Sequence, residues 1–262
     1  MRLLDGSWYL PASQRSGAAE YAAGHIPGAI FLDLDAISDR NTSLPHMLPA
    51  AADFALRLSA LGLHDTDDIV VYDGSGANLS AARVWWTFRV FGHRRVALLD
   101  GGMGKWRSEQ RSVEQGVVTL PPGDFTARLN QHAVRDLAAM QANLIHRREQ
   151  VVDVRSPGRF QGTEPEPRPG LRSGHLPGSR NLPFTELVNP DGTILPEAEL
   201  RRRLDAAGVD LSQPIVATCG SGTSACSLIL VLELLGHRDA AVYDGAWTEW
   251  GSRPDTPVES DI

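Results

Sequence analysis

The sequence predicts an α/β protein of two tandem domains that share one fold, each a mainly parallel sheet flanked by helices. Three observations predict this architecture. Blocks of the first half return in the same order in the second half, short β-branched apolar runs alternate with amphipathic stretches, and a proline- and glycine-rich break separates the two halves. Alternating strands and helices are typical of α/β folds with a parallel sheet.

The repeat consists of three pairs of collinear blocks. They are GHIPGAIFLD at 24–33 with GHLPGSRNLP at 174–183, IVVYDGSG at 69–76 with IVATCGSG at 215–222, and DGGMGKW at 100–106 with DGAWTEW at 244–250. Preserved order with small length differences in the intervening loops indicates a duplication. We therefore expect both halves to adopt the same fold.

Strands and helices are expected at corresponding places in the two halves. The runs with the composition of buried strands are 69–72, 96–99, 151–154, 215–218 and 241–243. Apolar residues recur at helical spacing in 79–91 and in 225–235, and a glycine follows each stretch. Glycine at this place is a helix stop signal, so these two stretches are predicted to be equivalent helices.

The break between the halves sets the predicted domain boundaries. Leu120-Pro121-Pro122-Gly123 interrupts any regular element, and polar residues follow to about Arg135. We therefore place the N-terminal domain at 1–119, the linker at 120–135 and the C-terminal domain at 136–262. Both domains are then close to the ~100–150 residues at which domain sizes cluster.

Composition and charge exclude several classes of protein. Of the 262 residues 42% are hydrophobic and 22% charged, as in an ordinary soluble protein, and the formal net charge of −7 argues against a nucleic-acid partner. The longest apolar run, 228–235, contains Glu233 and is far shorter than the ~20 residues of a membrane span. The opening residues show no signal peptide, so we expect a cytoplasmic protein. Two cysteines are too few for a disulfide framework.

Cys219 is the candidate nucleophile. It opens the segment CGSGTSA, which lies between a predicted strand and a predicted helix. Amides without partners at a helix N-terminus favour an anion, so a thiolate or a persulfide would be stabilised there, and Gly220 and Gly222 let the turn curl around the sulfur. This interpretation requires a sulfur that solvent can reach. The alternative is an inert buried thiol, which we prefer for Cys226 inside the predicted helix.

The first half provides an internal comparison at this position. Asp73 occupies the place of Cys219 in the aligned blocks, and an aspartate cannot act as a sulfur nucleophile. The first half is therefore expected to keep the fold without the thiol chemistry.

The paired GHIPG and GHLPG blocks, the CGSG turn after a strand and the DG-x-W endings resemble rhodanese domains over nearly the whole chain. GRFQGTEPEPR at 158–168 and HML at 46–48 resemble the 3-mercaptopyruvate sulfurtransferases more than the thiosulfate sulfurtransferases. The resemblance implies two α/β domains, a catalytic cysteine in the second, and transfer of sulfur through a cysteine persulfide to a thiol such as thioredoxin or to cyanide.

The resemblance also implies roles for individual residues. The catalytic group comprises the nucleophile Cys219, the hydroxyl of Ser221, and a proton relay of His46 and Asp35. The substrate-binding group comprises Arg159 and Arg168, which would bind the donor carboxylate, and the turn residues Gly220, Gly222, Thr223 and Ser224. The family usually has Val-Thr after the CGSG turn, whereas this chain has Thr223-Ser224, which weakens the choice of donor but not the chemistry.

Other interpretations remain open for some of these residues. His46 could pack in a loop and Asp35 could cap a turn, and the two arginines could be solvated charges like Arg155, Arg172 and Arg180 nearby. A planar guanidinium nevertheless suits a carboxylate through paired donors.

Alternative functions follow from the same turn. Thiosulfate sulfurtransferases usually carry basic residues after the cysteine, whereas 220–222 are neutral, so 3-mercaptopyruvate is the first choice and thiosulfate the alternative. A cysteine phosphatase needs an arginine about six residues after the nucleophile, where this chain has Ala225 and Cys226. A non-catalytic rhodanese binding module is less favoured because Cys219 and the arginines are present. No metal-ligand spacing and no GxGxxG after a strand occurs, so we expect no cofactor.

Overall fold

The computed structural model describes residues 1–260 of the chain and divides into two compact units. The first unit consists of Met1–Thr42, Leu48–Asn130 and Asn189–Ile194, and the second of Ser43–Met47, Gln131–Val188 and Leu195–Ile262. Each unit thus contains a short segment from the other half of the chain. The segment Ser43–Met47 brings His46 into the second unit.

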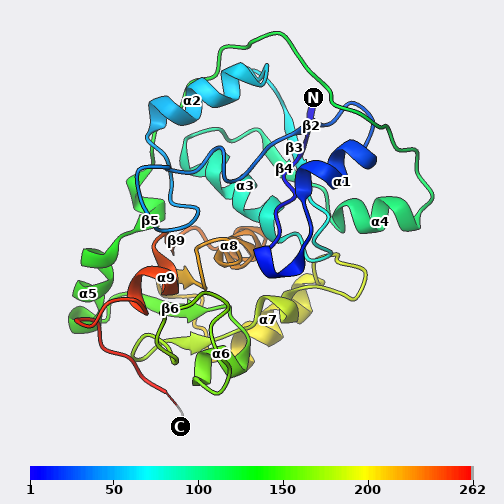
Figure 1. Ribbon diagram of the computed structural model, residues 1–262. Coiled ribbons are helices and arrows are strands. Elements are labelled where there is room, and N and C mark those ends of the chain that lie inside the picture. Colours follow the sequence, from blue (N-terminus) through cyan, green and yellow to red (C-terminus); the bar gives the residue numbers. More distant parts are fainter. Residues whose placement is uncertain (261–262) are drawn as a thin grey trace. The chain divides into compact units, whose positions relative to one another are not determined.

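The first unit contains a four-stranded sheet in the order β2-β1-β3-β4, and every pair of neighbouring strands is parallel (Figure 1). Its strands are β1 Arg2–Asp5, β2 Ile30–Phe31, β3 Ile69–Tyr72 and β4 Val96–Leu98. Its helices are η1 Pro11–Ser13, α1 Gly17–Ala23, α2 Ala51–Ala60, α3 Leu79–Val90 and α4 Gly102–Ser108.

The second unit contains a five-stranded sheet in the order β5-β9-β8-β6-β7, again with every pair parallel. Its strands are β5 Val134–Arg135, β6 Gln150–Asp153, β7 Arg180–Asn181, β8 Ile215–Thr218 and β9 Ala240–Tyr243. Its helices are η2 Gln131–Ala133, α5 Leu137–His146, α6 Pro157–Gln161, η3 Phe184–Leu187, α7 Glu197–Ala206, α8 Ala225–Leu234 and α9 Ala246–Trp250.

The two sheets repeat one topology, which confirms the predicted fold class. The order β2-β1-β3-β4 corresponds to β7-β6-β8-β9, and β5 is an additional edge strand of the second unit. The strands expected at 69–72 and 215–218 are β3 and β8 with the same bounds. Residues 131–135, which the sequence analysis assigns to the linker, form η2 and β5.

The two predicted helices end as the glycines indicate. Helix α3 is followed by Gly92 with a φ of 92°, and α8 by Gly236 with a φ of 82°. In both cases the next residue closes the end, because the N–H of His93 donates to the carbonyl of Phe88 and that of His237 to the carbonyl of Leu232, each at 2.9 Å. The left-handed conformation at these positions favours glycine.

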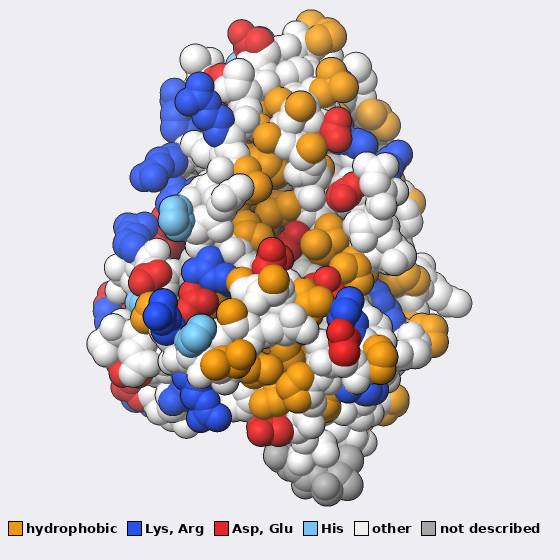
Figure 2. All heavy atoms as spheres, turned by 90° about the vertical axis from the view of Figure 1, so that its left-hand side faces the viewer, with side chains coloured by type: hydrophobic (Ala, Val, Ile, Leu, Met, Phe, Trp, Pro, Cys, Tyr) orange, Lys and Arg blue, Asp and Glu red, His pale blue; other side chains and the backbone are white. Residues whose placement is uncertain are grey.

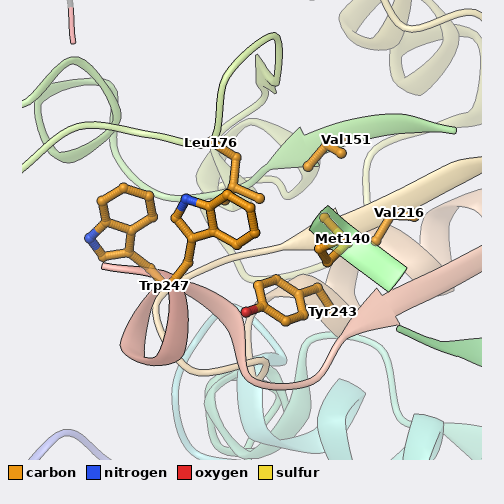
Figure 3. Packing of buried hydrophobic residues seen from close by; sticks show 7 residues of the cluster. Met140, Val151, Leu176, Val216, Tyr243 and Trp247 are labelled. Carbon is orange, nitrogen blue, oxygen red and sulfur yellow. The ribbon is translucent and has the colours of Figure 1, made fainter. Parts of the chain in front are cut away.

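Both faces of the sheet in the second unit are covered. Val151, Val216 and Tyr243 point to one face, where Met140 of α5 and Trp247 of α9 pack against them with Leu176 and Trp250 (Figure 3). The alternate residues of the same strands are also buried, and α8 packs against β8 and β9. Burial on both faces explains why β8 reads as an uninterrupted apolar run.

The GHIPG and GHLPG blocks that reveal the duplication have a structural role. His25 and His175 are buried, their Nδ1 atoms bond the carbonyls of Tyr21 (2.9 Å) and Phe160 (2.8 Å), and their rings stack on those residues. In both blocks the second glycine donates its N–H to a glutamate carboxylate. The blocks therefore shape equivalent turns.

Within residues 1–260 no helix has both the length and the apolar character needed to cross a bilayer. On the face of the molecule drawn in Figure 2, basic side chains lie among acidic ones.

Candidate active site

The turn that carries Cys219 is held by the backbone of α9. The carbonyl of Cys219 accepts from the N–H of Trp247 and the carbonyl of Gly220 from the N–H of Thr248, both at 2.9 Å. Gly222 has a φ of 76°, as expected for a residue that curls the turn. Gly220 does not have a positive φ in the structure, so backbone conformation does not require a glycine at this position.

Several backbone amides of this turn are free to meet an anion. Within the described chain, the N–H groups of Gly220, Ser221 and Thr223 donate to no protein acceptor. They lie between the end of β8 and the start of α8, where the dipole of the helix also favours negative charge. Successive unpaired amides of this kind form an anion-binding nest.

The equivalent turn of the first unit holds an anion of its own. The carboxylate of Asp73 accepts from the N–H groups of Ser75 and Ala81, both at 2.8 Å, and from the hydroxyls of Ser75 (2.6 Å) and Ser80 (3.1 Å). The turn and the start of α3 thus donate hydrogen bonds to the side chain at the position that Cys219 occupies in the second unit. The side chain at this position in the first unit is therefore a hydrogen-bond acceptor.

The expected solvent access of Cys219 is not found. Residue 219 is only 1% exposed, although the sequence analysis requires a sulfur that solvent can reach. Cys219 directly follows β8, whose residues are all buried, and its turn is bonded to α9 through the carbonyls of Cys219 and Gly220, so the residue lies in the interior of the unit. Cys226 is fully buried within α8, where its thiol donates to the carbonyl of Gly222 at 3.3 Å.

His46 lies at the hydroxyl side chains of the turn. Its Nδ1 atom is 3.2 Å from Oγ of Ser221 and 3.0 Å from Oγ1 of Thr223, and all three residues are buried. A backbone φ of 60° at His46, which is uncommon for a residue other than glycine, holds the imidazole in this place. The sequence analysis assigns Thr223 to substrate binding, whereas its hydroxyl contacts the same nitrogen as that of Ser221.

Asp35 belongs to the first unit. There its carboxylate accepts a hydrogen bond of 2.9 Å from Nε1 of Trp8. Its place in the relay with His46 stays a prediction.

Arg159 lies directly against the turn. A Cβ built on Gly220 would be 2.8 Å from Nη2 of Arg159, closer than real side chains approach. Gly220 is therefore required so that the guanidinium can come close to the residue after Cys219. Arg168 is half-buried nine residues further along, and its role stays a prediction.

Arg155 shows that one alternative in the sequence analysis was wrong. It was grouped with the solvated arginines, yet it is 1% exposed and lies 4.4 Å above the ring of Trp247. Its guanidinium donates to Asp153 at 2.6 Å and to Glu166 at 2.7 Å. Burial disfavours the charged form, but the attraction of the two carboxylates outweighs it and holds the pKa of Arg155 above its usual range.

Glu166 is the residue of this site that sequence reasoning missed. Its side chain is 2% exposed and accepts from both Arg155 and Arg159. The available signal was a pair of acidic residues, Glu164 and Glu166, between two arginines in the stretch 158–168, but a glutamate in a proline-rich loop ordinarily indicates exposure.

Among residues 1–260, no three histidine, cysteine, aspartate or glutamate side chains are grouped so that they could hold an ion.

Comparison with known proteins places the chain among sulfurtransferases. The family model described as "Rhodanese-like domain" matches residues 15–109 and again 136–253. The chain is 45% identical to thiosulfate/3-mercaptopyruvate sulfurtransferase 1, mitochondrial, of Arabidopsis thaliana, a match that covers 99% of this chain and 74% of the relative. It is 46% identical to 3-mercaptopyruvate sulfurtransferase of Rattus norvegicus, with 97% of this chain and 86% of the relative covered.

A solved structure shows the same similarity in three dimensions. The crystal structure of SseA from Escherichia coli, described as showing the rhodanese fold and catalytic mechanism of 3-mercaptopyruvate sulfotransferases, matches with a TM-score of 0.86 at 38% identity. The match covers 94% of this chain and 92% of that one.

Proposed function

The chain belongs to the rhodanese-like domain family, and on this premise we propose that it is a sulfurtransferase that takes sulfur from 3-mercaptopyruvate onto Cys219 and passes it to a thiol or to cyanide. The observation that carries the proposal is the nest of unpaired amides around Cys219, together with its counterpart in the first unit, where the same turn binds the carboxylate of Asp73.

The reaction has two steps. The thiolate of Cys219 attacks the sulfur of the donor, so that an S–S bond forms and the C–S bond of mercaptopyruvate breaks. The electron pair of that bond remains on the departing carbon as the enolate of pyruvate, which takes up one proton to become pyruvate. In the second step cyanide or a thiolate attacks the outer sulfur, leaves as thiocyanate or a persulfide, and returns the Cys219 thiolate. The amides of the turn stabilise the sulfur anion in both states.

His46 is proposed to handle the proton. Its Nδ1 contacts the hydroxyls of Ser221 and Thr223, which follow Cys219 closely in the turn. A hydroxyl at this place can deliver a proton to the enolate and be reprotonated by the imidazole. Asp35 is proposed to orient the imidazole, as carboxylates do in other relays. Such general acid–base assistance typically contributes ~10²–10⁴-fold in rate.

The donor is proposed from the arginines. Arg159 at the turn and Arg168 in the same loop would bind a carboxylate, which mercaptopyruvate has and thiosulfate lacks. The neutral residues 220–222 agree with this choice. The Arabidopsis relative carries both donors in its name, and thiosulfate is therefore the alternative donor for the same persulfide chemistry.

Access to the sulfur must involve movement, because Cys219 is 1% exposed. The groups that cover the turn have to part before the donor can reach the sulfur. Lids and loops that close over a reacting group exclude water and are common in enzymes.

The proposed sulfur acceptor is a thiol, such as that of thioredoxin, or cyanide. The proposed location of the protein is the cytoplasm. Cys219 and Cys226 form no disulfide in the described chain, as is usual for proteins of compartments that keep thiols reduced.

Intact-mass measurement tests the function. After incubation with 3-mercaptopyruvate and removal of excess donor, the wild-type chain should gain the mass of one sulfur, and cyanide should remove it. The Cys219→Ser variant should gain none, whereas Cys226→Ser should behave like the wild type. A wild type that gains no sulfur from mercaptopyruvate or thiosulfate contradicts the proposal.

A further inference from the structure

Glu166 links a buried arginine to the arginine at the turn. Its Oε1 accepts from Nη1 of Arg155 at 2.7 Å and from Nε of Arg159 at 3.2 Å, and its Oε2 accepts from Nη2 of Arg159 at 2.5 Å. We propose that Glu166 is a positioning residue, which holds the Arg159 guanidinium at the Cys219 turn in the orientation that receives the carboxylate of the donor. This inference rests on the proposed function.

Arg155 fixes the position of the Glu166 side chain. The guanidinium of Arg155 donates to both carboxylate oxygens of Asp153 and to the carbonyl of Gly174, and it lies over the ring of Trp247. With 1% exposure it has no room to move. A carboxylate bonded to this anchor is itself held still, so the position of Glu166 is set by the protein and not by solvent.

Glu166 and a donor would use different edges of the Arg159 guanidinium. Glu166 takes the edge formed by Nε and Nη2. Within residues 1–260, Nη1 of Arg159 donates to no acceptor, so the edge formed by Nη1 and Nη2 is available to a second carboxylate. The donor can therefore bind without displacing Glu166.

Charge explains why Arg159 needs this partner. Arg155 and Arg159 are two cations that share Oε1 of Glu166 as an acceptor. Without the carboxylate they would repel each other, with the single charge of Asp153 to offset both. Arg159 is the one that would move, because its side chain is 22% exposed whereas that of Arg155 is 1% exposed.

The first unit contains the same device. Arg15 is held by Glu20 through its Nε and Nη2 atoms, at 2.7 and 2.6 Å, and its Nη2 donates to the carbonyl of Gly74 at 3.2 Å. Gly74 is the counterpart of Gly220 in the duplicated turn. In both units a glutamate accepts hydrogen bonds from Nε and Nη2 of an arginine, and that arginine lies close to the glycine of the turn.

The test replaces Glu166 by glutamine and compares two donors. Mercaptoacetone keeps the thiol and the ketone of mercaptopyruvate but lacks the carboxylate. We expect Glu166→Gln to raise the KM for 3-mercaptopyruvate on the order of ten- to a hundredfold, the loss that misplacement of a positioning group causes. Turnover of mercaptoacetone should change less than about twofold, because that donor has no carboxylate for Arg159 to bind.

Two further variants complete the experiment. Glu164→Gln makes the same change two residues away, at an exposed glutamate that bonds Ser156, and should leave both donors unaffected. Glu166→Asp keeps the charge on a shorter side chain and should restore part of the lost affinity. It also carries the test if Glu166→Gln does not fold.

Four results would overturn the proposal. A KM for mercaptopyruvate that falls in Glu166→Gln would mean that Glu166 competes with the donor for Arg159. Equal losses with both donors would mean that it only maintains the fold. A wild type that takes no sulfur from mercaptopyruvate would remove the proposed function and this inference together, whereas an active wild type with an unchanged Glu166→Gln variant would remove this inference alone.

Discussion

Nη2 of Arg159 lies 2.8 Å from the point where a Cβ of residue 220 would be. The guanidinium thus occupies the space that a side chain next to Cys219 would need. This contact joins the nucleophile turn to the proposed carboxylate site, and it explains a glycine whose φ is not positive.

Replacement of Gly220 by alanine should separate activity from stability. The new methyl group would push Arg159 aside, and the far end of a flexible side chain yields at little cost to the fold. We expect kcat/KM with 3-mercaptopyruvate to fall by roughly tenfold or more, while the thermal unfolding midpoint stays within a few degrees of the wild type. Gly104→Ala, where a Cβ meets nothing within 4 Å, is the control and should affect neither. Unchanged kinetics in Gly220→Ala would show that the position of Arg159 is irrelevant.

Arg168 is expected to distinguish the two donors. If it binds the carboxylate of mercaptopyruvate, Arg168→Ala should raise the KM for that donor by roughly tenfold or more and the KM for thiosulfate much less. Steady-state rates with cyanide as acceptor measure both values. Arg148→Ala, at an exposed arginine outside the loop, serves as the control. Equal effects on the two donors would show that Arg168 does not bind the carboxylate of mercaptopyruvate.

The two hydroxyls at His46 should substitute for each other in part. Since Oγ of Ser221 and Oγ1 of Thr223 contact the same nitrogen, Ser221→Ala and Thr223→Val should each lower kcat by several-fold, and the double variant by about 10²-fold. Single-turnover release of pyruvate is the measurement. Ser227→Ala, which removes a buried hydroxyl without a partner in the described chain, should leave kcat unchanged. A double variant no slower than the single ones would mean that one hydroxyl plays no part.

Opening of the turn should be visible in the alkylation of the thiols. Both are buried in the structure, but Cys219 is on a turn and Cys226 is inside helix α8. Iodoacetamide in native buffer should therefore modify Cys219 several-fold faster than Cys226, because local opening of a turn costs less free energy than unfolding of a core helix. Peptide mapping by mass spectrometry gives both rates. Equal, very slow modification of the two would indicate that Cys219 reacts only in the unfolded chain.

The sequence predicts the fold better than it predicts the site. The duplication and the long apolar runs identify β3, β8, α3 and α8 almost to the residue. Strands β2 and β7 were not predicted, because two residues are too short to show a pattern and are held by pairing alone.

The site depends on contacts that local pattern does not contain. His46 and Ser221 are 175 positions apart, and only the family resemblance connected them. Arg155 and Glu166 are buried because each has the other as a partner, so the usual expectation of exposure for a charged residue fails for both. The burial of Cys219 likewise results from packing on α9.

The end of β1 provides a prediction on pH. Asp5 and Asp153 are the last residues of equivalent strands, and each accepts from the N–H two residues on, at 3.0 and 2.9 Å. Asp153 also has the guanidinium of Arg155, whereas the first unit has Ser7 at the corresponding place. Burial raises the pKa of Asp5 above its usual range.

A carboxyl whose pKa is raised by folding binds its proton more tightly in the native than in the unfolded chain. Its contribution to stability therefore declines as the pH rises from the unfolded pKa of ~3.9 through the folded one, by about 1.4 kcal/mol for each unit of the shift, and stays low at neutral pH. The Asp5→Asn variant has no carboxyl at this position and therefore lacks this decline in stability. Its stability relative to the wild type should rise between pH 4 and pH 7, measured by urea unfolding at both values. Asp153→Asn should instead lower the stability at pH 7, because it leaves the buried Arg155 with one carboxylate fewer. A difference between Asp5→Asn and the wild type that does not change with pH would mean that Asp5 titrates alike in the folded and unfolded chains.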